Sequence, residues 1–367
     1  MTDYIETTNT PIHPSEILKD ILEDREISQK NLADRLGIST KHMNELLKGQ
    51  VSFTPAMALK LEFVLDTPAQ TWLKLQSNYD IIKSRLEMSD QLNKQFIAEK
   101  DRLTDFKYCY ANLQNWGFVS KTTVRKNRYM NILEFFATPS LQLLTNNYHL
   151  AKFRQGTAEA DVYSIAAWMR VGERQFEANR PEKEFNAQDF KKSLETIRQL
   201  TTQPINQASR TLVDICAKAG VTVVFTPYFS KTHINGSTKW IAPSRPLIQL
   251  SERNKKSDTL WFTFFHEAGH ILLHSKKQNY ISWDSVAESD HFEEEKAADL
   301  FARNTLIPSV DYIKFIQAGK FDHQSILSFS RQQKIGPDIV AGRLAYEKHI
   351  EWSYADVFAK RIKLEKV

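Results

Sequence analysis

The chain has 367 residues, of which 41% are hydrophobic and 25% are charged, a composition typical of folded domains in water and long enough for two or three of them. The formal net charge of +5 permits contact with nucleic acid but does not require it, because Lys and Arg are spread along the whole sequence. No apolar run approaches the roughly 18–20 residues that span a bilayer, and the polar segment 1–6 lacks the features of a signal peptide, so we expect a cytoplasmic protein with no membrane partner.

The cysteine content limits the kinds of metal site that the chain can build. Cys109 and Cys216 provide neither a disulfide framework nor a CxxC pair. Each is expected to be a small buried residue. Any metal must therefore be held by histidine and carboxylate side chains.

The sequence changes in character along its length, which indicates a multi-domain protein. Residues 12–85 contain short amphipathic helices, residues 86–203 are helical and poor in glycine, residues 204–350 mix helix and strand, and residues 351–367 form a tail. The proline at 204 marks one boundary because proline disfavours helix in the residue before it. We predict an all-α helix-turn-helix N-terminal domain, a helical middle region and an α+β, zincin-like C-terminal domain.

The first part predicts short helices joined by tight turns. A helix begins at Pro14, and Ser28 is a good N-cap for the next one. Gly37 can adopt the left-handed conformation that a sharp turn needs. Ser39 or Thr40 then caps a third helix. Helix, glycine turn and helix is the layout of a helix-turn-helix.

The second helix of such a pair lies in the major groove of DNA, with its N-terminal residues at the base edges. Lys41 can reach a phosphate or a guanine, and Asn44 can pair with adenine. Gln29, in the preceding helix, can bind a phosphate. The expected DNA-binding residues are therefore Gln29, Ser39, Thr40, Lys41 and Asn44. The alternative is a helical hairpin that binds nothing.

The segment from Pro14 to about Asp80 resembles the Cro/CI-type (XRE family) helix-turn-helix of HigA antitoxins. The matching text is His13-Pro14-Ser15-Glu16, Ser28-Gln29-Lys30-Asn31-Leu32-Ala33, Leu36-Gly37-Ile38-Ser39, Leu46-Leu47-Lys48-Gly49 and Thr71-Trp72-Leu73-Lys74-Leu75-Gln76. The resemblance implies a homodimer that binds a palindromic operator in double-stranded DNA. Such a protein would be associated with the nucleoid when bound.

The middle region carries a basic cluster at residues 121–128. A contact with nucleic acid and a solvated helix end are both open interpretations of this cluster. No motif indicates a ligand pocket in the region, and its expected role is to join the DNA-binding part to the C-terminal part.

The C-terminal part begins with signals for strands. The β-branched run from Val221 to Phe225 and the run from Pro246 to Leu250 each predict a strand. Asn235-Gly236 predicts a hairpin turn that leads into a strand over residues 237–241. An apolar helix is expected from Ser257 to His274.

That helix contains His266-Glu267-Ala268-Gly269-His270. Two histidines four residues apart lie on one helical face, so both imidazoles can reach the same Zn²⁺. Glu267 is adjacent to the first ligand, where a carboxylate acts as general base toward a water nucleophile and later protonates the leaving amine. The segment therefore predicts the site of a zinc metallo-endopeptidase.

A catalytic zinc needs a third protein ligand. Four residues along an α-helix turn about 40° beyond a full turn, so His274 is displaced from the face that carries the first two histidines. We therefore interpret it as a packed or supporting histidine. The third position of the metzincin spacing is occupied by Lys276. In the next amphipathic helix, Glu295 can bind the zinc, and Asp299 one turn later can accept a hydrogen bond from a ligand histidine.

Residues from about 205 to 350 look like the ImmA/IrrE family of metallopeptidases. The matching text is the run from Phe262 to His274, the run from Glu295 to Ala302, Leu306-Ile307-Pro308 and the run from Val340 to Leu344. Asp299 stands where the family often has Asn, which keeps a hydrogen-bond acceptor. The resemblance carries zinc ligation onto His266, His270 and Glu295, and the role of general base onto Glu267.

Members of that family typically cleave a helix-turn-helix repressor in response to stress or to induction of a mobile element. The expected function is a DNA-binding transcriptional regulator whose endopeptidase cuts a repressor or its own chain, for example in a linker near residues 85–107. The strands before the zinc helix would hold an extended substrate by β-addition. The alternative is a non-catalytic regulator of antitoxin type whose zinc domain is structural or senses a ligand. A third interpretation is a component of a toxin–antitoxin pair.

Overall fold

The computed structural model describes residues 10–147, 160–253, 255–274, 280–283 and 292–362. Segment 1–6 and Lys276, which entered the sequence predictions, lie outside these ranges. The chain divides into two compact units, residues 1–99 and 100–367, and each is described by itself. Among the residues in these ranges, no helix is both long and apolar enough to cross a bilayer.

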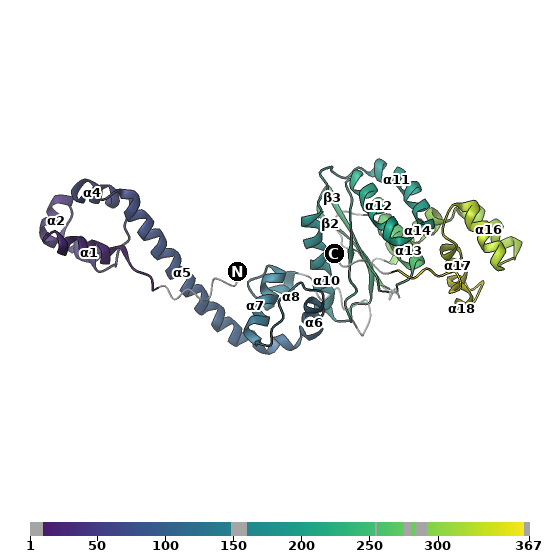
Figure 1. Cartoon of the computed structure of the whole chain (residues 1–367), viewed down its shortest axis with the longest axis horizontal. Helices are drawn as coiled ribbons and strands as arrows, with labels where there is room; N and C mark the ends of the chain where they lie inside the picture. Colours follow the sequence, from purple (N-terminus) through teal and green to yellow (C-terminus); the bar gives the residue numbers. More distant parts are fainter. Residues whose placement is uncertain (1–9, 148–159, 254, 275–279, 284–291, 363–367) are drawn as a thin grey trace. The chain divides into compact units, whose positions relative to one another are not determined.

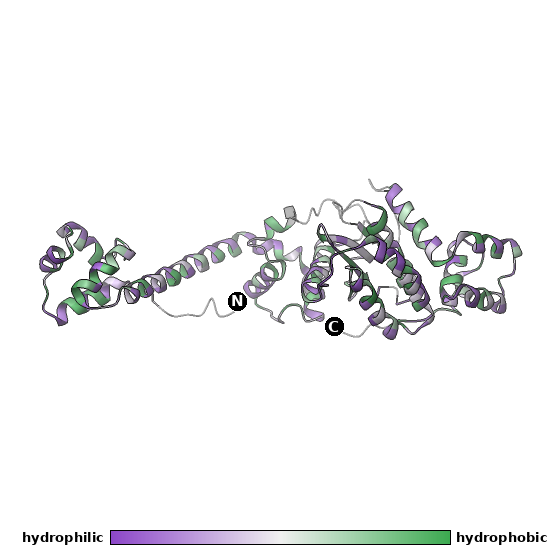
Figure 2. Ribbon diagram, turned by 90° about the horizontal axis from the view of Figure 1, so that it is seen from above, coloured by the Kyte–Doolittle hydropathy of each residue, from purple (hydrophilic) through white to green (hydrophobic). Residues whose placement is uncertain are grey.

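The first unit is helical throughout its described part (Figure 1). Its helices are α1 (Pro14–Asp24), α2 (Gln29–Leu36), α3 (Thr40–Leu47), α4 (Pro55–Leu65) and α5 (Ala69–Glu99). Each of the first four helices carries hydrophilic and hydrophobic residues together (Figure 2). The apolar faces close around a core that includes the buried side chains of Leu32, Leu46, Leu61 and Trp72.

The local signals that predicted the helix-turn-helix are confirmed by the backbone. The Ser28 hydroxyl oxygen accepts a hydrogen bond from the Asn31 amide at 3.2 Å, and the Ser39 hydroxyl oxygen accepts one from the His42 amide at 3.1 Å. Gly37 has a φ of +65°, in the left-handed region that a residue with a Cβ rarely adopts. The two caps and the glycine therefore set the angle between α2 and α3.

The second unit contains a four-stranded sheet and the remaining helices. The strands are β1 (Thr222–Thr226), β2 (Ile234–Ala242), β3 (Arg245–Ser251) and β4 (Tyr280–Trp283). The helices are η2 (Lys100–Thr104), α6 (Lys107–Asn115), α7 (Arg125–Phe136), α8 (Leu141–Asn147), α10 (Val162–Ala178), α11 (Ala187–Gln199), η3 (Leu200–Thr202), α12 (Ile205–Lys218), α13 (Ser257–Leu273), α14 (Phe292–Leu306), α15 (Ser309–Ala318), α16 (His323–Gln333), α17 (Pro337–Tyr346) and α18 (Trp352–Ala355). The structure confirms the predicted strands near 221–225 and 246–250 as β1 and β3. It also confirms the helix predicted from Ser257 to His274 as α13 and the next amphipathic helix as α14.

The sheet has the order β1-β3-β2-β4, with β1 parallel to β3 and the other pairs antiparallel. Helix α10 lies on one side of the strands, and α12 and α13 lie on the other (Figure 1). Val223 and Ile248 face the core that α12 and α13 share, whereas Val224 and Leu247 pack with Phe176 of α10. Because both faces are covered, every residue of β3 is buried.

Helix α10 comes from the middle region of the sequence, and a buried polar contact joins it to the sheet. The Gln249 side-chain amide donates to the Trp168 carbonyl at 2.6 Å and to the Thr226 hydroxyl at 2.9 Å. Gly172 makes room for this amide, since a Cβ there would lie 2.1 Å from the Gln249 Oε1. The predicted domain boundaries at residues 85, 203 and 350 stay predictions. Residues 162–178, from the predicted middle region, cover one face of the sheet in the second unit.

The prediction of a hairpin turn at Asn235-Gly236 is wrong, because both residues lie inside β2. The turn between β2 and β3 falls at Pro243-Ser244 instead. A Cβ on Gly236 would lie 2.5 Å from the Thr263 Cγ2 and 3.0 Å from the Glu267 Oε1. The glycine therefore allows α13 to approach the strand closely, which is a second common reason for glycine in a strand.

The pair α16–α17 repeats the turn geometry of α2–α3. Lys334 is left-handed like Gly37, and each is followed by an isoleucine and then by the N-cap of the next helix. However, most of α17 is buried, including Val340 and Leu344. The second pair therefore supports α13 and does not present a helix to DNA.

Candidate metal centre and nucleic-acid interface

Helix α13 is buried along the whole of residues 263–271, because it lies between the sheet, α14 and α17. Small residues set its distance from α14. A Cβ on Gly269 would lie 3.2 Å from the Ala298 Cα, and both Ala298 and Ala302 are fully buried. This close approach brings the carboxylates of α14 opposite the two histidines of α13.

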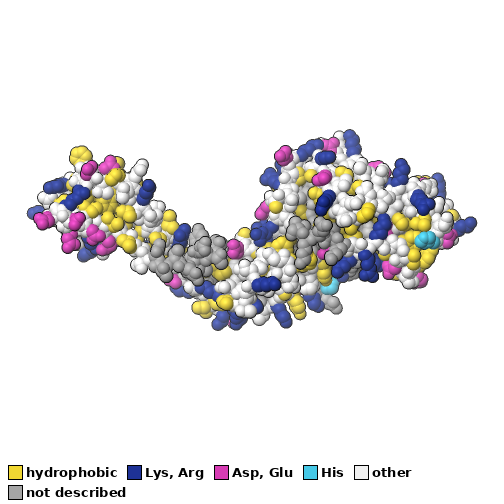
Figure 3. All heavy atoms as spheres, in the orientation of Figure 1, with side chains coloured by type: hydrophobic (Ala, Val, Ile, Leu, Met, Phe, Trp, Pro, Cys, Tyr) yellow, Lys and Arg dark blue, Asp and Glu magenta, His cyan; other side chains and the backbone are white. Residues whose placement is uncertain are grey.

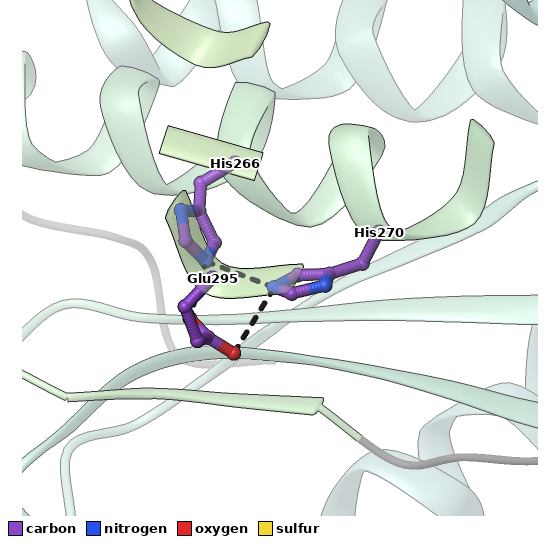
Figure 4. Close-up of side chains that lie close together, drawn as sticks. All are labelled: His266, His270 and Glu295. Carbon is purple, nitrogen blue, oxygen red and sulfur yellow. Dashed lines mark hydrogen bonds and ion pairs between the residues drawn. The ribbon is translucent and has the colours of Figure 1, made fainter. Parts of the chain in front are cut away.

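Three of the predicted ligands converge on one point (Figure 4). The Nε2 atoms of His266 and His270 are 2.9 Å apart. The Glu295 carboxylate lies 3.1 Å from the His266 Nε2 and 3.4 Å from the His270 Nε2. Donors around a tetrahedral Zn²⁺ with bonds of 2.0–2.1 Å are about 3.3 Å apart. The three side chains therefore fit a metal ion of this size.

The second ring nitrogen of each histidine also has a partner. The His266 Nδ1 lies 2.8 Å from the Asp299 Oδ1, and the His270 Nδ1 lies 2.9 Å from the His274 Nδ1. These contacts hold both rings with Nε2 toward the centre. His274 thus lies behind His270, on the side away from Glu295. That Asp299 and His274 support bound metal stays a prediction.

The charges of the cluster match a site for a cation. Burial acts to raise the pKa of Glu295, but hydrogen bonds from both histidines outweigh it and lower the pKa to about 2. Burial lowers the pKa of His270 to about 4. Burial also acts to lower the pKa of His266, but its hydrogen bonds to Asp299 and Glu295 raise it to about 10. A protonated His266 would direct one N–H at Asp299 and the other at Glu295, and a cation bound at Nε2 would displace the second proton.

Glu267 lies next to His266 in the sequence but faces the sheet. Its side chain is 0% exposed, and its Oε2 accepts a hydrogen bond of 2.7 Å from the Thr238 hydroxyl of β2. The same hydroxyl lies 3.1 Å from the Glu267 main-chain carbonyl oxygen. The sequence analysis missed Thr238, and only its place two residues after Gly236, on the same face of a strand, could have indicated it.

Tyr280 of β4 is a second residue that the sequence analysis missed. Its ring stacks on the His270 imidazole, with centroids 4.1 Å apart and an interplanar angle of 16°. Tyr280 pairs with Thr238 across β2 and β4. The two missed residues therefore lie on one strand pair, with Thr238 against Glu267 and Tyr280 against His270.

The predicted DNA-binding residues lie at the surface of α2 and α3. The Lys41 side chain is 86% exposed, and Gln29, Thr40 and Asn44 are also exposed. The Ser39 oxygen is engaged as the N-cap of α3, so the cap takes one of its two acceptor positions. Their contact with DNA stays a prediction. His42, in the first turn of α3, is a further half-exposed side chain on this surface.

Two protein-family models match the chain. Residues 18–59 match the Cro/C1-type HTH DNA-binding domain, and residues 216–344 match the IrrE N-terminal-like domain of the Peptidase M78 model. The second match includes His266, His270 and Glu295. The two matches lie in the two separate units.

Individual proteins resemble part of the chain. The Uncharacterized HTH-type transcriptional regulator YddM of Escherichia coli (strain K12) is 30% identical over 71 residues, which are 19% of this chain and 76% of that protein. Virulence-associated protein I of Dichelobacter nodosus is 37% identical over 71 residues, or 19% of this chain and 66% of that protein. The structure of Pseudomonas aeruginosa antitoxin HigA with the higBA promoter covers 23% of this chain and 95% of its own, with 33% identity and a TM-score of 0.22.

Proposed function

Because the chain belongs to the Cro/C1-type helix-turn-helix regulators and carries an IrrE N-terminal-like domain in its second unit, we propose that it is a DNA-binding regulator with a zinc-dependent endopeptidase site. The observation that carries the proposal is the convergence of His266, His270 and Glu295, with Glu267 next to His266 in α13. The proposed substrate is a repressor or the chain itself, cut in response to stress or to induction of a mobile element.

The proposed chemistry follows from the positions of these side chains. A bound Zn²⁺ would polarise the scissile carbonyl and make a water molecule more acidic. Glu267 would serve as the base that takes a proton from this water and as the acid that returns it to the nitrogen of the leaving amine. Thr238 holds the Glu267 carboxylate in one orientation through the 2.7 Å hydrogen bond. Asp299 and His274 hold the two imidazoles so that each Nε2 lone pair stays directed at the centre.

An extended substrate has a strand available beside this centre. In the sheet formed by the described residues, β4 is an outer strand, and its Tyr280 touches His270. Outer strands offer unpaired N–H and C=O groups to an added strand. We therefore place the substrate along β4, with its scissile bond near His270.

The Glu267→Gln variant tests the proposed activity. It keeps the size and a hydrogen-bond acceptor for Thr238 but removes the base, so zinc content and folding should match the wild type while cleavage is lost. Glu293→Gln, on the exposed side of α14, is the matched control and should cleave normally. Purified proteins would be incubated with candidate repressors, and the products, including fragments of the chain itself, identified by mass spectrometry.

Burial favours a second candidate function, a non-catalytic regulator whose metal site is structural. His270 and Glu267 are both 0% exposed, and closed ligand sets are typical of structural zinc. The same experiment separates the two functions. Identical products and identical reporter transcription from wild type and Glu267→Gln would rule out the endopeptidase.

A further inference from the structure

Charge is divided unevenly between the two units. Residues 1–99 hold 11 Lys and Arg against 15 Asp and Glu, whereas residues 100–367 hold 38 against 29. Affinity for DNA depends largely on positive side chains that displace counterions from phosphates. The unit that contains the helix-turn-helix is thus net negative, and the excess of positive charge lies in the other unit.

One concentration of positive charge lies directly after α5. Between residues 100 and 128 there are seven Lys and Arg against two Asp. We call these seven residues the basic surface: Lys100, Arg102, Lys107, Lys121, Arg125, Lys126 and Arg128. In Figure 3, Lys and Arg side chains (dark blue) lie along the lower edge of this part of the second unit.

Contacts of two of these residues bring η2, α6, α7 and the segment before α7 together. The Arg125 guanidinium donates to the Lys100 carbonyl at 3.1 Å, so the start of η2 lies against the start of α7. The Arg128 guanidinium donates to the Thr122 carbonyl at 3.0 Å and lies 5.6 Å from the centre of the Tyr110 ring. The two arginines thus hold the backbone in place. Lys107 and Lys121 are exposed, and Lys126 is half-buried.

Little negative charge offsets this surface. Asp101 lies 3.8 Å from Arg125, but both side chains are exposed, and such pairs contribute little. Within the described ranges, no carboxylate lies within salt-bridge distance of Lys107, Lys121 or Lys126. Their ammonium groups are therefore available to a partner.

We propose that the basic surface binds the phosphate backbone of double-stranded DNA. The chain runs from α5 directly into Lys100, so binding of the first unit raises the effective concentration of DNA at this surface. Flexible lysines suit backbone contacts, which position a protein without reading sequence. The proposal rests on the helix-turn-helix and is independent of the peptidase activity.

The full-length triple variant Lys107→Gln, Lys121→Gln, Lys126→Gln tests the proposal and leaves the two structural arginines intact. The matched control removes three exposed lysines of α11 and α12: Lys191→Gln, Lys192→Gln and Lys218→Gln. Fluorescence anisotropy would give the Kd of each protein for a labelled non-operator duplex of about 30 base pairs, at salt concentrations from about 50 to 200 mM.

Each phosphate contact contributes about 0.9 to the slope of log K against log salt, so the triple variant should lower that slope by about 2–3. The single Lys126→Gln variant should lower it by about 1. The control triple should keep the wild-type slope. The proposal is overturned if the two triples behave alike, or if single-stranded RNA of equal length displaces the duplex from wild type but not from the triple variant.

Discussion

The Asp299→Ala substitution is predicted to weaken zinc binding without removing any ligand. Asp299 Oδ1 lies 2.8 Å from the His266 Nδ1, so the carboxylate fixes both the ring orientation and the nitrogen that carries the proton. Removing such a supporting group typically costs 10–100-fold in metal affinity, or about 1.4–2.7 kcal/mol. Asp299→Asn keeps an acceptor oxygen at the same position and should lose less than Asp299→Ala.

Competition with a chromophoric chelator would measure the zinc Kd of both variants and the wild type. Thermal unfolding of the metal-free proteins would show that the fold is retained. Equal Kd values for wild type and Asp299→Ala would refute the supporting role. The same affinity loss for the Asn and Ala variants would show that the charge of Asp299, and not its acceptor oxygen, matters.

Three further predictions address other parts of the molecule. Thr238→Val should lower the cleavage rate about 10–100-fold at unchanged zinc content, because it removes a hydrogen bond to a charged group that contributes about 1.5–3 kcal/mol, and Thr238→Ser should restore the rate. Lys41→Ala and Asn44→Ala should each weaken operator binding by about 1–3 kcal/mol, and unchanged footprints would place the contacts elsewhere. Burial, helped by the nearby Asp338, raises the pKa of Asp258, so its contribution to stability is present below the ordinary pKa and lost as pH rises. Asp258→Asn should therefore raise the Tm relative to wild type more at about pH 7 than at about pH 4, and a pH-independent difference would contradict this.

Features decided within a few residues of the chain could be predicted from the sequence. The caps at Ser28 and Ser39 and the turn at Gly37 depend on local backbone geometry. The shared face of His266 and His270 follows from the helical repeat alone. The helical repeat, together with the small residues around Glu295, also predicted that Glu295 and not His274 is the third ligand.

Features that depend on distant segments could not be predicted in this way. Asn235-Gly236 has the composition of a turn, but its glycine serves the approach of Thr263 and Glu267, about 30 residues later. Thr238 reaches Glu267 because β2 packs against α13, and Tyr280 reaches His270 from β4, which pairs with β2. Helix α10 covers the sheet and contacts Gln249, a polar residue between two apolar neighbours in β3.

The sequence by itself determined the two candidate sites of this protein's chemistry, since a helix-turn-helix and a pair of histidines placed to hold a metal are each encoded within one or two helices. Only the tertiary structure decided which side chains surround that chemistry. Strand pairing and helix–sheet packing join residues far apart in the chain, and the patterns within each segment do not state which partner it will meet. The distribution of charge depends on both sequence and tertiary structure. The sequence divides the charge between the two units, and the contacts of Arg125 and Arg128 bring the basic segments together.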